Sequence, residues 1–127
     1  MDFAGKVVLV TGAGSGLGCA ASLAFAREGA ALCLVGRSRA KLEETGRLIR
    51  DAGGRCVELA CDLGEPHGCR EAIEGAMTAF GRLDVLCNIA ADVMFHRLAD
   101  IKEEEWNRTI ASNLSGPFFL MQAAMPH

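Results

Sequence analysis

The residues with the clearest chemical purpose form a glycine-rich loop, T-G-A-G-S-G-L-G, at positions 11–18. Glycines between a strand and a helix permit a tight turn, let the backbone approach a pyrophosphate and let the helix pack closely on the sheet. The helix N-terminus then offers free N–H groups to phosphates, and Ser15 adds a hydroxyl donor. The loop therefore predicts a dinucleotide site; a glycine-rich turn without a ligand is the alternative.

The spacing of the glycines distinguishes between the known kinds of phosphate-binding loop. The strict G-x-G-x-x-G pattern fails because Cys19 stands where the third glycine is needed, whereas Gly12, Gly16 and Gly18 fit G-x-x-x-G-x-G. No G-K-[ST] follows, which excludes a P-loop.

A basic residue stands where NAD-binding proteins carry an acid. That acid is expected about 20 residues past the glycines, at the end of the second strand, but Gly36 holds the position and Arg37 follows. A guanidinium there suits a 2′-phosphate through bidentate contacts. We therefore expect NADP(H) rather than NAD(H), with Arg39 assisting; the alternative is that both arginines only solvate the start of a helix.

Two kinds of segment alternate along the chain and position these residues. Short apolar runs predict buried parallel strands, and amphipathic stretches between them predict helices. The alternation predicts an α/β fold, a parallel sheet of order 3-2-1-4 with helices on both faces and an unpaired fourth strand at the edge. The predicted strands span residues 7–10, 31–35, 55–61 and 84–90, and the first three helices span 17–28, 39–52 and 67–80.

The last part of the chain predicts a broken helix. Asp100 and Glu103 have the spacing of a capping box, which places the start of a fourth helix after Asp100. Pro117 then forces a kink or a restart before residues 118–124.

Composition excludes several classes of protein. The chain has 127 residues, enough for one domain, with 50% hydrophobic and 23% charged residues, which excludes disorder. A net charge of −3 gives no basic surface for binding nucleic acid or an anionic membrane.

The amino terminus reaches a strand at once and no apolar run is long enough to span a bilayer, so we expect no signal peptide and a cytoplasmic protein. The six cysteines form no C-x-x-C pair, so we expect reduced thiols and no metal.

Four segments in order resemble the short-chain dehydrogenase/reductase family. The T-G-x-x-x-G-x-G pattern at residues 11–18 is the first, and C-D-L at 61–63 resembles the Asp-bearing turn beside the adenine. D-V-L-C-N-I-A-A at 84–91 resembles the fourth-strand segment that ends in N-N-A-G, and I-A-S-N-L-S-G-P-F at 110–118 resembles the segment that carries the helix asparagine. Asp62 also has a simpler interpretation as a helix cap, and both roles are compatible.

The resemblance implies a doubly wound, Rossmann-like fold and an oxidoreductase that interconverts alcohols and carbonyls with NAD(P). It assigns a catalytic role to Asn113, and it implies a small-molecule alcohol or ketone substrate and a homo-oligomer joined partly through residues 106–125. The cofactor-binding residues that it predicts are Gly12, Ser15, Gly16, Leu17, Gly18, Arg37, Asp62, Leu63, Asn88 and Ala90.

The chain departs from the family pattern in two ways. Ile89 and Ala91 replace the second Asn and the Gly of N-N-A-G, and losing that glycine strains the turn if the position needs a positive φ. The family's catalytic Ser, Tyr and Lys have no counterpart, and the sequence contains no tyrosine at all. We therefore expect residues 1–127 to be the N-terminal, dinucleotide-binding part of a single domain, truncated before those residues and inactive alone.

Two other functions remain open at this point. One is a nucleotide-binding or regulatory module without catalysis. The other is a different Rossmann-type enzyme such as a methyltransferase, which Gly36 and Arg37 disfavour because such sites also want an acid after the second strand. The substrate cannot be identified; residues 94–96 are candidates for one wall of its pocket, or an ordinary loop.

Overall fold

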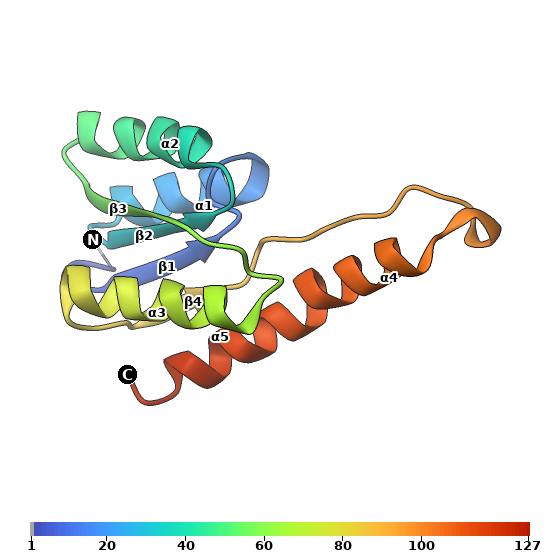
Figure 1. Cartoon of the computed structure of the whole chain (residues 1–127). Helices are drawn as coiled ribbons and strands as arrows, with labels where there is room; N and C mark the ends of the chain where they lie inside the picture. Colours follow the sequence, from blue (N-terminus) through green and yellow to red (C-terminus); the bar gives the residue numbers. More distant parts are fainter. Residues whose placement is uncertain (1) are drawn as a thin grey trace.

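The computed structural model describes residues 2–127 as one parallel sheet between two helical layers (Figure 1). Helices α1 and α2 cover one face, and α3 and α5 cover the other. The strands are β1 (Val7–Thr11), β2 (Ala31–Gly36), β3 (Arg55–Ala60) and β4 (Val85–Cys87). The helices are α1 (Gly16–Arg27), α2 (Arg39–Asp51), α3 (Pro66–Phe80), α4 (Glu103–Ile110) and α5 (Gly116–Ala124), with a 3₁₀ turn at Leu98–Asp100 and a π-helical turn at Ala111–Ser115.

The sheet has the order β3-β2-β1-β4, which confirms the predicted order and places β4 at an edge. Strand β1 is buried along its whole length, because β2 and β4 flank it and helices cover both of its faces. Its side chains alternate between two cores, as the pleat of a strand requires. Val8 and Val10 pack in the core toward α1 and α2, and Val7 and Leu9 pack in the core toward α3 and α5.

Strand β4 is shorter than predicted. The apolar run at 84–90 predicts a longer strand, but only three residues pair with β1. The cause is the buried side chain of Thr11, whose Oγ1 accepts hydrogen bonds from the backbone N–H groups of Ile89 at 2.9 Å and Ala90 at 3.0 Å. The same hydroxyl donates to the carbonyl of Cys87 at 3.3 Å. Thr11 therefore draws these N–H groups away from the sheet, ends the strand and fixes the turn after it.

The fourth helix also begins later than predicted. It starts at Glu103, and the backbone N–H of Lys102 donates to Glu105 at 3.0 Å, so Glu105 takes the part predicted for Glu103. Asp100 instead pairs with Arg97 at 2.8 Å within the 3₁₀ turn. The restart expected at Pro117 is wrong: the chain stays helical from Glu103 through the π-helical turn, which ends at Ser115, into α5, and the proline fits in the first turn of α5. No helix in residues 2–127 is long and apolar enough to cross a bilayer.

Asp84 fastens the opposite end of β4 to β1. Its carboxylate accepts hydrogen bonds from the backbone N–H of Val7 at 2.9 Å and from Arg82 at 2.6 and 2.9 Å. Lys6 lies 3.5 Å away. The hydrogen bonds from Arg82 and Val7 hold the pKa of Asp84 far below its ordinary value. The short edge strand is thus held by polar side chains at both ends, Asp84 before it and Thr11 after it.

We expect Asp84→Asn to lower the melting temperature at neutral pH. A carboxylate with a depressed pKa stabilises the fold above its unfolded-state pKa, and this stability is lost as the pH falls toward the folded-state pKa. The difference in melting temperature from the wild type should therefore be widest above about pH 5 and shrink as the pH falls toward about 2. Asp51→Asn, which removes an exposed ion pair with Arg47 on α2, is the control and should show little difference. A gap that does not depend on pH would contradict this account of Asp84.

We expect Thr11→Val to destabilise the protein by about 2 kcal/mol or more, because it keeps the shape but leaves the N–H groups of Ile89 and Ala90 without their acceptor. Thr11→Ser keeps the hydroxyl and loses one methyl group, so it should cost only about 1 kcal/mol. Urea unfolding of the two variants measures both losses. If valine is tolerated as well as serine, Thr11 does not hold the turn through hydrogen bonds.

Candidate functional site

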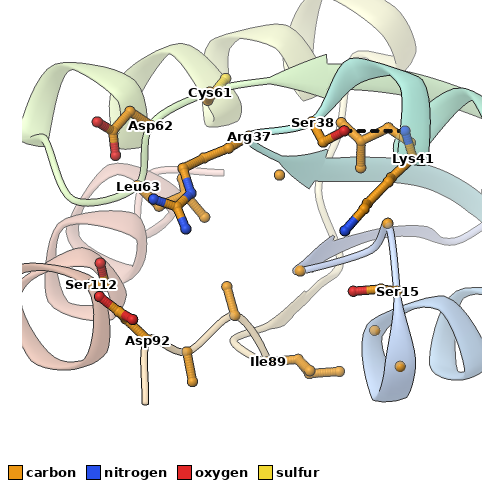
Figure 2. Close-up of a pocket in the computed structure, with 18 of the residues that line it drawn as sticks. Ser15, Arg37, Ser38, Lys41, Cys61, Asp62, Leu63, Ile89, Asp92 and Ser112 are labelled. Carbon is orange, nitrogen blue, oxygen red and sulfur yellow. Dashed lines mark hydrogen bonds between the residues drawn. The ribbon is translucent and has the colours of Figure 1, made fainter. Parts of the chain in front are cut away.

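A cavity of about 500 Å³ opens at the carboxyl ends of the strands, within the range of small-molecule sites (Figure 2). The loops after all four strands contribute to it, and it lies where the order of the strands reverses beside β1, the usual ligand position in sheets of this type. Its lining residues are Gly12, Gly14, Ser15, Gly16, Leu17, Gly18, Gly36, Arg37, Ser38, Lys41, Leu42, Cys61, Asp62, Leu63, Gly64, Ile89, Ala90, Ala91, Asp92 and Ser112.

The glycine loop forms the floor where β1 passes into α1. A Cβ on Gly18 would collide with the carbonyl oxygen of Gly12, so only glycine lets the helix start this close to the strand. A Cβ on Gly12 would lie 3.0 Å from the Cα of Ala90. Gly16 has a φ of +52° and a Cβ there would meet nothing, because it faces open space. Ser15 precedes the helix without capping it, which leaves its hydroxyl available to a ligand.

The second βα loop brings positive charge to the cavity. The guanidinium of Arg37 points into it, as predicted (Figure 2). Arg39 does not line it; this side chain lies over a separate hollow beside Glu58, Glu71 and Glu74. The structure therefore does not bring Arg39 to the predicted site.

Ser38 and Lys41 line the cavity although sequence reasoning gave neither a role there. The sequence holds a signal that could have found Lys41, because Ser38 directly precedes the amphipathic stretch 39–52 and serine is a favoured N-cap residue. A residue three positions after a cap lies in the first helical turn, at the same end of the helix as the cavity.

The third βα loop carries Asp62 and Leu63, and both line the cavity as predicted. One carboxylate oxygen of Asp62 accepts the backbone N–H of Gly64 at 2.9 Å, which stabilises the turn leading to α3. Asp62 therefore both stabilises this turn and lines the cavity.

The turn after β4 forms another wall. Ala90 lines the cavity with Ile89, Ala91 and Asp92, whereas Asn88 is exposed and does not. No non-glycine residue in the described chain has a positive φ, so Ala91 replaces the family's glycine without the strain considered above.

Asn113 lies beside the cavity and fastens this wall to the helix. Its side-chain oxygen accepts the N–H of Asp92 and its amide donates to the carbonyl of Asp92, both at 2.7 Å. Arg108 pairs with the Asp92 carboxylate at 2.6 Å. Asn113 itself does not line the cavity, but its neighbour Ser112 does, and both belong to the π-helical turn. The link between Asp92 and Asn113 spans 21 residues of sequence, and no local pattern announces it.

The cysteines do not form a reactive or metal-binding group. All six are free thiols. Burial raises the pKa of Cys33 to about 12 and also raises the pKa of Cys61, which lines the cavity. Within residues 2–127, no three His, Cys, Asp or Glu side chains are grouped as metal ligands would be. Besides the carboxylates of Asp62 and Asp92, the cavity offers glycine backbone, hydroxyls and cations, which are groups that suit phosphates.

Known proteins resemble this chain in sequence. The sequence pattern of the short chain dehydrogenase family matches residues 6–127. An uncharacterized oxidoreductase of Thermotoga maritima is 38% identical over 125 residues, which are 98% of this chain and 49% of that protein. Glucose and ribitol dehydrogenase homolog 2 of Arabidopsis thaliana is 37% identical over 130 residues, which cover 97% of this chain and 45% of that protein.

Solved structures agree with the fold. A metagenomic short-chain oxidoreductase in complex with NADP superposes with a TM-score of 0.94 at 36% identity, over 99% of this chain and 57% of that one. L-Sorbose reductase of Gluconobacter frateurii, complexed with NADPH and L-sorbose, has a TM-score of 0.94 at 31% identity, over 99% of this chain and 49% of that one.

The chain spans about half the length of the curated relatives that it matches. The chain belongs to the short chain dehydrogenase family.

Proposed function

We propose that this chain binds NADP(H) and supplies the cofactor-binding part of an oxidoreductase that interconverts alcohols and carbonyls. The observation that carries the proposal is the combination of Arg37 and the open glycine loop at opposite sides of one cavity. The relatives in complex with NADP and NADPH support the same cofactor.

The residues present fit the parts of such a cofactor. The pyrophosphate fits over the start of α1, where Gly16 leaves space and the first N–H groups of the helix are free. Arg37 suits the 2′-phosphate, and Asp62 and Leu63 form the wall for the adenine. Ala90 lines the cavity, and we assign it to the nicotinamide end; Asn88 does not line the cavity, and its role as a cofactor-binding residue stays a prediction.

The bound cofactor supplies the hydride, and this chain's residues position it. Asn113 holds the turn after β4 through both backbone groups of Asp92, and thereby fixes the wall where the reacting end of the cofactor fits. The sequence has no tyrosine, so the general acid of the family is not among these residues. We propose that residues 1–127 are the dinucleotide-binding part of a single domain whose Ser, Tyr and Lys are not among them.

Several finer assignments belong to the same proposal. They are an alcohol or ketone as substrate, a homo-oligomer, and a cytoplasmic location. A nucleotide-binding module without catalysis is the alternative function, because the cavity accounts for cofactor binding and does not by itself imply catalysis. A hydride-transfer assay on protein that also carries the family's Ser, Tyr and Lys separates the two, since the module would bind NADPH without turnover.

We expect Arg37→Ala to weaken NADPH binding far more than NADH binding. A hydrogen bond to a charged group contributes about 1.5–3 kcal/mol, so NADPH affinity should fall by about one to two orders of magnitude. Fluorescence titration of both cofactors measures the two effects. Arg47→Ala is the matched control, since Arg47 lies on α2 away from the cavity and pairs with Asp51. Equal weakening of both cofactors would show that Arg37 does not recognise the 2′-phosphate.

A further inference from the structure

We infer that Lys41 is a second cation for the 2′-phosphate of NADP(H), and that it sets cofactor preference together with Arg37. The inference rests on the proposed function and extends it to a residue that the family pattern described above does not include. Lys41 and Arg37 both line the cavity, and Figure 2 shows the ammonium of Lys41 directed into it on the side of Ser15 and the guanidinium of Arg37 on the side of Leu63.

The start of α2 places Lys41 beside the glycine loop. Its backbone N–H donates to the hydroxyl of Ser38 at 3.4 Å, in the first turn of α2. Its stem lies against the glycine loop, where a Cβ on Gly14 would come within 2.9 Å of the Cβ of Lys41. The side chain therefore leaves the helix directly beside the loop, and Gly14 is the residue that permits this close approach.

Neither of these two cations forms an ion pair with a carboxylate that lines the cavity. Two carboxylates line the cavity, but Asp62 is bound to the N–H of Gly64 and Asp92 is paired with Arg108. Among the described residues, no carboxylate lies within ion-pair distance of Arg37 or Lys41.

The other end of α2 shows the contrast. Arg47 pairs with Asp51 at 3.6 Å and Arg50 pairs with Glu58 at 2.7 Å. Arg47 and Arg50 thus have acidic partners, whereas Lys41 forms no ion pair within residues 2–127; Arg39, which lies outside the cavity, forms none there either.

A phosphate monoester matches this arrangement. It carries a charge of about −1.5 to −2 at pH 7 and three acceptor oxygens, enough for both a guanidinium and an ammonium. NAD(H) carries a neutral hydroxyl at the same place, so it gains nothing comparable from Lys41. Removing the ammonium should therefore affect only ligands that carry the 2′-phosphate.

The experiment compares 2′,5′-ADP with 5′-AMP, which differ only in that phosphate, by isothermal titration of the purified protein. Lys41→Met should weaken 2′,5′-ADP about tenfold and leave 5′-AMP within about twofold, because the partly solvated ion pair is worth the lower end of a charged hydrogen bond. Lys41→Arg should retain most of the preference. Arg39→Met is the matched control, since it removes a cation from the same helical turn that lies outside the cavity, and it should change neither ligand by more than about twofold.

Each result decides the matter. Preference for 2′,5′-ADP that survives in Lys41→Met, or an equal loss for both ligands, overturns the role of Lys41 and leaves the proposed function standing. An effect of Arg39→Met equal to that of Lys41→Met also overturns it, because general charge would then explain the loss. A wild-type protein without preference for 2′,5′-ADP overturns this inference and the proposed NADP(H) specificity together.

Discussion

The site depends on one contact, the direct approach of Gly18 on α1 to the carbonyl oxygen of Gly12 at the end of β1. No side chain fits between them, so the first turn of the helix lies immediately over the end of the strand. Strand β1 cannot adjust to relieve a clash, because it is buried on both faces and flanked by β2 and β4. The free N–H groups of the helix therefore face the cavity at a fixed place, and the other loops are arranged around them.

Hydrogen bonds made by polar side chains fix the wall of the cavity after β4. Thr11 holds the turn after β4, and Asn113 and Arg108 hold Asp92, so hydrogen bonds fix this wall in addition to the packing of Ile89 and Ala90 against the two cores. The same contacts leave the carboxylate of Asp92 already paired. The cavity consequently keeps its positive charge on the side of α2, where the sequence has no acidic residue at the end of the strand or in the first helical turn.

The sequence predicts the parts of this arrangement that follow from local patterns. Apolar runs and glycine punctuation predict the alternation of strands and helices, and the glycine spacing with Arg37 predicts the parts of the cavity formed by the first and second βα loops. It does not predict where β4 ends, because that depends on Thr11, which lies 78 residues away in sequence from Ile89. Nor does the sequence predict that Arg37 and Lys41 line the cavity while Arg39 does not. The orientation of α2 on the sheet places Arg39 at a separate hollow.

The most direct test of the whole account is to locate the bound cofactor by NMR, using ¹⁵N-labelled protein titrated with NADPH. We predict that the amide signals of residues 12–18, 36–42, 61–64 and 89–92 shift together and that those of residues 116–124 stay in place. Saturable shifts confined to other residues, with the 12–18 loop unchanged, would contradict the assignment of this cavity as the dinucleotide site.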